Sequence, residues 1–173
     1  MNVATKNIGK LFAALVITAL SFCLIGCQKE LTGKEAVDKY ESIEAVEVFK
    51  NEAASDLVEI IDIVGEITDS KSRDTKLELY EDLLKKQVEV DRVCDDLIAI
   101  KDYPKACEEL HAQLVTSAEN IKKAADCFER TGFYDMQENI NTGTKRAKEA
   151  DTYTDNAVDA AERYNELKEE MMK

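Results

Sequence analysis

The chain has 173 residues, and 36 acidic residues against 23 basic ones give it a formal net charge of −13 at pH 7. Such an acidic surface repels phosphate groups, so the composition argues against nucleic acid as a partner. The chain has only six glycines and one proline, and it is rich in alanine, glutamate, lysine and leucine, a composition typical of an all-helical protein.

The first element in chain order is an apolar run over residues 11–25. A start with two lysines and no acidic residue precedes this run, and Gly26 and Cys27 follow it. A basic start, a short apolar run and small residues at its end are the layout of an export signal. A membrane-spanning helix needs about 20 apolar residues, and a polar chain starts directly after Cys27. We therefore expect an export signal rather than a membrane span.

The end of this run, Leu24-Ile25-Gly26-Cys27, resembles the lipobox of bacterial lipoproteins. The resemblance implies that the Cys27 thiolate receives a diacylglyceryl group and that the chain is cut between Gly26 and Cys27. Two or three acyl chains of the palmitate class would then hold the protein on the extracytoplasmic face of the cell membrane, because each buried methylene contributes about 0.8 kcal/mol. In composition the chain is also similar to many Gram-positive cell-surface lipoproteins.

This processing would divide the chain into three parts. Residues 1–26 would be the signal peptide, residues 27–31 a short lipidated tether, and residues 32–173 the folded domain. Loss of the two lysines in the signal leaves 21 basic residues against 36 acidic ones, so the mature formal charge would be −15. Anionic lipid headgroups would repel such a domain, and the acyl chains would have to hold it.

The folded domain is expected to begin with two long helices. The first runs over residues 32–67 and opens at Thr32-Gly-Lys-Glu35, which has the spacing of a capping box. The polar stretch TDSKSRD ends it, because serine, threonine and aspartate side chains compete for backbone hydrogen bonds. The second helix runs over residues 74–100.

Two further helices follow a tight turn at residues 101–104, with Pro104 tolerated in the first turn of the third helix. That helix is expected to end at Thr131-Gly132, with glycine as a left-handed stop. Asp135-Met-Gln-Glu138 again has capping-box spacing, so the fourth helix is expected to open there and run to the end of the chain.

Apolar residues recur every three or four positions in all four predicted helices. Wide apolar seams joined by short loops indicate an antiparallel up-down-up-down four-helix bundle. The seam of the fourth helix consists mostly of small residues, including Ala150 and Ala157, so its neighbours can approach closely. The alternative is a long helical hairpin or coiled coil that dimerises, but the seams are wider than the two-position seam of a coiled coil.

Three cysteines, Cys94, Cys107 and Cys127, would remain after signal removal and lipidation of Cys27. No pair has CxxC spacing, so the cysteines support neither a zinc knuckle nor a redox motif. We expect three free thiols. The alternative is a strained disulfide between Cys94 and Cys107, which flank the turn between the second and third helices.

No motif for catalysis or for a cofactor is found. His111 is the only histidine, and Glu108-x-x-His111 is half of a ferritin-like di-iron site, which needs a second histidine. We therefore expect His111 to be an ordinary surface or boundary residue, and expect no metal. Phosphate-binding loops, HExxH and G-x-S-x-G are also absent from the sequence, so we expect no enzymatic activity and no cofactor.

The sequence thus favours a membrane-anchored, non-catalytic helical module for interaction or structure at the cell surface. A bundle that binds a small molecule or metal between its helices is the alternative. The partner would be a protein of unknown identity that contacts the end of the bundle far from the membrane. Phe133 and Tyr134 are the expected contacts there, because aromatic residues are enriched in binding hot spots.

Overall fold

The computed structural model describes residues 30–173, and every regular element in this part of the chain is a helix. The prediction of an all-helical domain is therefore confirmed. In chain order the elements are α2 (Gly33–Glu41), α3 (Glu44–Asp69), α4 (Arg73–Ile98), the short 3-10 helix η1 (Lys105–Cys107), α5 (Glu108–Met136) and α6 (Ile140–Met171). The predicted signal peptide and residues 27–29 of the predicted tether lie outside the described residues.

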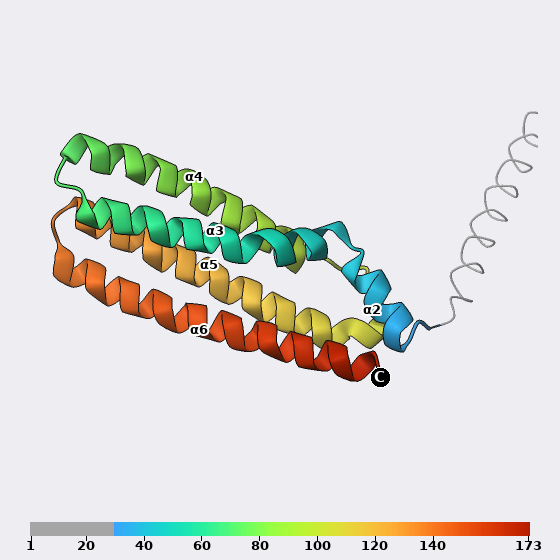
Figure 1. The fold of residues 1–173 in the computed structure, drawn as a ribbon. Coiled ribbons are helices and arrows are strands. Elements are labelled where there is room, and N and C mark those ends of the chain that lie inside the picture. Colours follow the sequence, from blue (N-terminus) through green and yellow to red (C-terminus); the bar gives the residue numbers. More distant parts are fainter. Residues whose placement is uncertain (1–29) are drawn as a thin grey trace, which may run out of the picture. The chain divides into compact units, whose positions relative to one another are not determined.

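The four long helices lie along one another, and each runs opposite to the one before it (Figure 1). The helix α2, the connection between α4 and α5, and the C-terminus lie at one end, which we call the α2 end. The α3–α4 and α5–α6 turns lie at the opposite end, called here the turn end.

Helix α5 is the centre of the packing, because it lies against α3, α4 and α6. The α5–α6 interface is lined by small residues, as the sequence predicts: Ala150 and Ala157 are buried, and Ser117 Oγ donates to the Ala157 carbonyl over 3.0 Å. Within the described residues, α6 makes close backbone contact with α5 and α2 and with no other helix. Helices α4 and α6 therefore lie on two sides of α5 without close backbone contact.

The predicted first helix is wrong in one respect, because the chain breaks at Ser42 and Ile43 into α2 and α3. Ser42 Oγ donates to the Lys39 carbonyl over 2.8 Å, and Ile43 has extended backbone angles. The break turns α2 onto the end of the other helices and buries Ala36, Val37 and Tyr40. Thr32 is the N-cap of α2 as predicted, but its side chain makes no capping hydrogen bond.

The predicted boundary between the third and fourth helices is also wrong. Helix α5 continues through Gly132 to Met136, because the missing side chain of Gly132 makes room for neighbouring helices. A Cβ at this position would lie 2.8 Å from a methyl carbon of Leu83 and 3.3 Å from one of Ile67. Gly132 is therefore a packing residue, not a helix stop.

Asp135, the predicted cap of the fourth helix, instead lies buried in the last turn of α5. Its carboxylate accepts a hydrogen bond of 2.6 Å from Thr68 Oγ1 and so ties α5 to the end of α3. The chain turns at Glu138, whose φ of 60° is left-handed, and α6 begins after the N-cap Asn139. A tertiary contact therefore replaces the local cap that the spacing predicts.

Candidate functional site

The expected lipidation site Cys27 and the expected cleavage site after Gly26 lie outside the described residues. Both stay predictions from the lipobox. Among the described residues, no helix is long and apolar enough to cross a membrane.

The expected partner contacts Phe133 and Tyr134 lie near the end of α5, at the turn end of the domain. Phe133 is 40% exposed and Tyr134 is half-buried. The Phe133 ring centre lies 6.1 Å from that of Tyr80 on α4 and 5.6 Å from that of Tyr134. The hydroxyl of Tyr80 donates to the Glu129 carboxylate and orients its ring. We call Tyr80, Phe133 and Tyr134 the aromatic cluster.

A groove of about 420 Å³ lies where α4 and α6 flank the outer side of α5. Its lining includes three cations and three anions together with Tyr153 and Cys127. Most of these charges already have partners: Arg146 pairs with Glu149 at 2.6 Å, and Lys122 lies 3.6 Å from Asp91. A ligand would have to displace these ion pairs, so the groove is a solvated surface rather than a preformed pocket.

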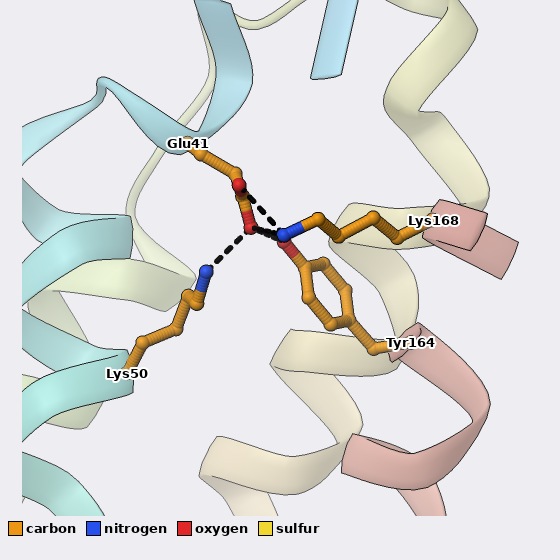
Figure 2. A network of polar contacts seen from close by, with 4 residues as sticks. All are labelled: Glu41, Lys50, Tyr164 and Lys168. Carbon is orange, nitrogen blue, oxygen red and sulfur yellow. Dashed lines mark hydrogen bonds and ion pairs between the residues drawn. The ribbon is translucent and has the colours of Figure 1, made fainter. Parts of the chain in front are cut away.

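A polar network joins α2 to α3 and α6 (Figure 2). Glu41, the last residue of α2, accepts hydrogen bonds of 2.8 Å from the Tyr164 hydroxyl and from Lys168 Nζ, and another from Lys50 Nζ. Lys168 Nζ bridges both carboxylate oxygens, at 2.8 Å each. One carboxylate therefore holds three donors from two helices.

The donors around Glu41 change the pKa of its carboxyl group. Partial burial alone would raise the pKa of its carboxyl group, but hydrogen bonds from Lys168, Lys50 and Tyr164 outweigh it and lower the pKa to about 2. Burial and the hydrogen bond to Glu41 raise the pKa of Tyr164, so its hydroxyl stays protonated. The network thus holds α2 against α3 and α6.

His111 lies in a second contact of α2, with Tyr40. The Tyr40 oxygen and His111 Nδ1 are 3.0 Å apart, and the Tyr103 ring centre is 4.3 Å from that of His111. Burial, assisted by the nearby Lys101 charge, lowers the pKa of His111, and burial raises the pKa of Tyr40. The hydrogen bond therefore joins a protonated hydroxyl to a neutral imidazole. His111 is 7% exposed, so it is a core residue rather than the surface or boundary residue expected.

The three cysteines of the domain, Cys94, Cys107 and Cys127, are free and buried in the structure. Burial raises the pKa of all three thiols, that of Cys94 to about 12. Because the thiolate is the reactive form, these groups are poor nucleophiles. The thiol count stays a prediction for measurement.

Sequence reasoning missed the Glu41 network, since Glu41 and Tyr164 are 123 positions apart. The one local signal is the Tyr164–Lys168 spacing of four residues, which places both side chains on one side of α6. Within residues 30–173, no group of three or more histidine, cysteine, aspartate or glutamate side chains is arranged to hold a metal ion. Comparison with protein-family models, with curated proteins and with solved structures gives no match.

Proposed function

We propose that this protein is a lipid-anchored lipoprotein of the extracytoplasmic membrane surface, in which an antiparallel four-helix bundle serves as a non-catalytic interaction module. The observation that carries the proposal is the Leu24-Ile25-Gly26-Cys27 lipobox directly after a short apolar run. The start of α2 at Gly33 supports it, because the helical domain begins only a few residues after Cys27.

The tether between the lipid and the domain is short. Four residues, Gln28 to Leu31, separate Cys27 from the cap at Thr32. At about 3.3–3.6 Å per residue, an extended link of this length reaches about 15 Å. The α2 end of the domain therefore stays within about 15 Å of the headgroups, and the Glu41 network keeps α2 attached to the rest of the domain.

The experiment that tests the anchor is the Cys27→Ser variant of the full chain, expressed in a bacterial host. A hydroxyl cannot replace the thiolate, so we expect the variant to keep its signal and lack the lipid mass, which intact mass spectrometry measures. Cys23→Ser is the matched control, because it changes a cysteine four positions earlier and should leave processing intact. A wild-type mature chain that starts elsewhere, or carries no lipid, would overturn the proposal.

The aromatic cluster at the turn end is the proposed contact surface of the module. Phe133→Ala with Tyr134→Ala should weaken chemical crosslinking to neighbouring proteins in the native membrane, while helicity and melting stay nearly unchanged. Val58→Ala with Ile61→Ala, which truncates exposed apolar residues on α3, is the control. Normal crosslinking of the aromatic variant, or its unfolding, would assign these rings to the core instead.

A further inference from the structure

Several exposed apolar residues lie on α4 and α5 near the aromatic cluster. Leu77, Leu84 and Val88 of α4 are 44%, 42% and 68% exposed, and Phe133 of α5 is 40% exposed. Their spacing of seven and four residues places the three α4 side chains on one stripe. Tyr80, one turn from both Leu77 and Leu84, connects this stripe to the Phe133 ring. We call these five residues the α4 patch. Single exposed apolar residues are ordinary, but adjacent ones mark interaction sites.

We propose that the α4 patch is the interface of a homodimer in which α4 packs antiparallel against α4 of a second copy. The charged residues beside the patch support a second copy of the chain as the partner. Asp74, Glu81, Lys85 and Arg92 are all exposed, and their spacing of seven, four and seven residues places them along one flank of the stripe. Of these four residues, the two acidic ones come first and the two basic ones second.

A twofold rotation makes this flank complementary to itself. Asp74 and Arg92 are each nine positions from residue 83, and Glu81 and Lys85 are each two positions from it. An antiparallel copy centred there places Asp74 beside Arg92 of the second copy and Glu81 beside its Lys85. In antiparallel helix pairs the same flanks meet, so symmetry gives four ion pairs across the interface.

The apolar residues agree with the same register. At this register Leu77 lies opposite position 89 of the second copy, next to its Val88, and each Leu84 lies one position from the twofold axis. The Lys85–Asp82 and Arg92–Asp96 pairs within each chain, at 2.8 and 3.3 Å, are solvent-exposed. Arg92 also lies 3.8 Å from the exposed Glu52 of α3. Such surface pairs contribute little to stability, so Lys85 and Arg92 can exchange partners.

The other exposed apolar stripe does not fit a second copy. Val58 and Ile61 lie on α3, which carries eight acidic residues and only one lysine. Two copies of such a helix would repel each other. Substitutions on this face of α3 therefore serve as a control, because their side chains are similarly exposed but should not affect the dimer.

The area is sufficient for a weak dimer. Residues 74–92 span about 27 Å at about 1.5 Å per residue. Two neighbouring helices about 10 Å apart, α4 and the adjoining part of α5, give a face about 20 Å wide. Each copy would bury about 540 Å², close to 1,100 Å² in total, just above the minimum of about 1,000 Å² for a specific interface. Association in the micromolar range is expected.

This interface does not depend on the lipid anchor, but the two together determine an orientation. The antiparallel pairing places the two α2 ends at opposite ends of the dimer. If the proposed function also holds, both short tethers reach one bilayer only when the dimer lies along the membrane surface.

Sedimentation equilibrium of the full chain in a density-matched detergent tests the inference. The wild type should associate in a concentration-dependent way, with a dimer as the largest species. Leu84→Glu with Val88→Glu should make it monomeric, whereas Val58→Glu with Ile61→Glu on α3 should leave the dimer intact. Circular dichroism should show native helicity in every variant, since all four positions are exposed.

Charge reversal gives the more specific result. Arg92→Asp and Asp74→Arg should each weaken the dimer about tenfold, because each places like charges together at two symmetric positions. The double variant should restore wild-type affinity. A wild type that stays monomeric, equal loss of the dimer in the α3 variant, or a double variant no better than the single ones would each overturn the proposal. None of these outcomes depends on Cys27.

Discussion

Replacement of Glu41 by glutamine tests the network that holds α2 in place. The substitution keeps the shape of the side chain and removes its charge. Tyr164 can still donate to the amide oxygen, but Lys50 and Lys168 lose their common carboxylate. In the wild type the two ammonium groups share one carboxylate, and in the variant they lie close together with no anion between them. We therefore expect a clear fall in the free energy of unfolding at neutral pH.

The magnitude follows from the acidity of the group. A fall in the pKa from 4.5 to about 2 corresponds to about 3 kcal/mol, at about 1.36 kcal/mol for each pH unit. The Glu41 side chain is 23% exposed, and solvent screens the attraction. We therefore expect a loss of about 1–2 kcal/mol at pH 7, which lowers the melting temperature of a domain of this size by about 3–6 °C.

The dependence on pH distinguishes the carboxylate from simple packing. The pKa of Glu41 is lowered by folding, so its stabilisation is complete above pH 4.5 and is lost as the pH falls toward 2. Urea unfolding at pH 7, 5 and 3 should give equal differences between wild type and Glu41→Gln at the first two values and less than half that difference at pH 3. Glu166→Gln, which breaks an exposed pair with Arg163, should change little throughout. A Glu41→Gln chain as stable as wild type at pH 7, or a difference independent of pH, would refute the reasoning.

Further predictions concern packing, the histidine and the thiols. Gly143→Ala should cost about 1–3 kcal/mol in urea unfolding, because its Cβ would lie 2.4 Å from Asp135 Oδ1. Gly65→Ala, with no atom within 4 Å, should instead stabilise α3 by about 0.5–1 kcal/mol. The imidazole resonance of His111 should titrate below 6.5, and stability should fall as the pH drops below that value. A midpoint at or above 6.5 would contradict its burial beside Tyr40. The unreduced, denatured mature protein should contain three free thiols, and a count of one would indicate the alternative disulfide.

The helical content and most of the turns could be predicted from the sequence, because they depend on local properties. Glycine and proline are scarce and apolar residues recur every three or four positions throughout residues 32–173. Both features indicate long helices. The polar stretch after Ile67 and the segment before Pro104 end helices through their own side chains and backbone, and both lie where the structure has turns. Phe133 could also be singled out, since an aromatic residue beside an expected turn is exposed whether α5 ends before or after it.

The errors have a common cause, which is that the meaning of a residue can depend on a distant neighbour. Gly132 has the sequence position of a helix stop, but it lies inside α5, where Leu83 and Ile67 approach the place that a Cβ would take. Asp135 has the spacing of a cap, yet Thr68 from α3 captures its carboxylate. For the same reason a local pattern alone does not show that α2 turns away from α3.

Ser42 is only a weak local signal for a helix break. The break is stabilised by the contacts that α2 then makes with α5 and α6. A continuous helix through Ser42 would carry α2 away from α5 and α6, so Tyr40 would lose the contact with His111 and Glu41 would lose two of its three donors. Both partners lie more than 70 positions away in the chain. An isolated helix of nine residues is unstable in water, so α2 forms because these contacts hold it. Hydrogen exchange should therefore show α2 opening more readily than α3 in the Glu41→Gln chain, although the two are joined by only two residues.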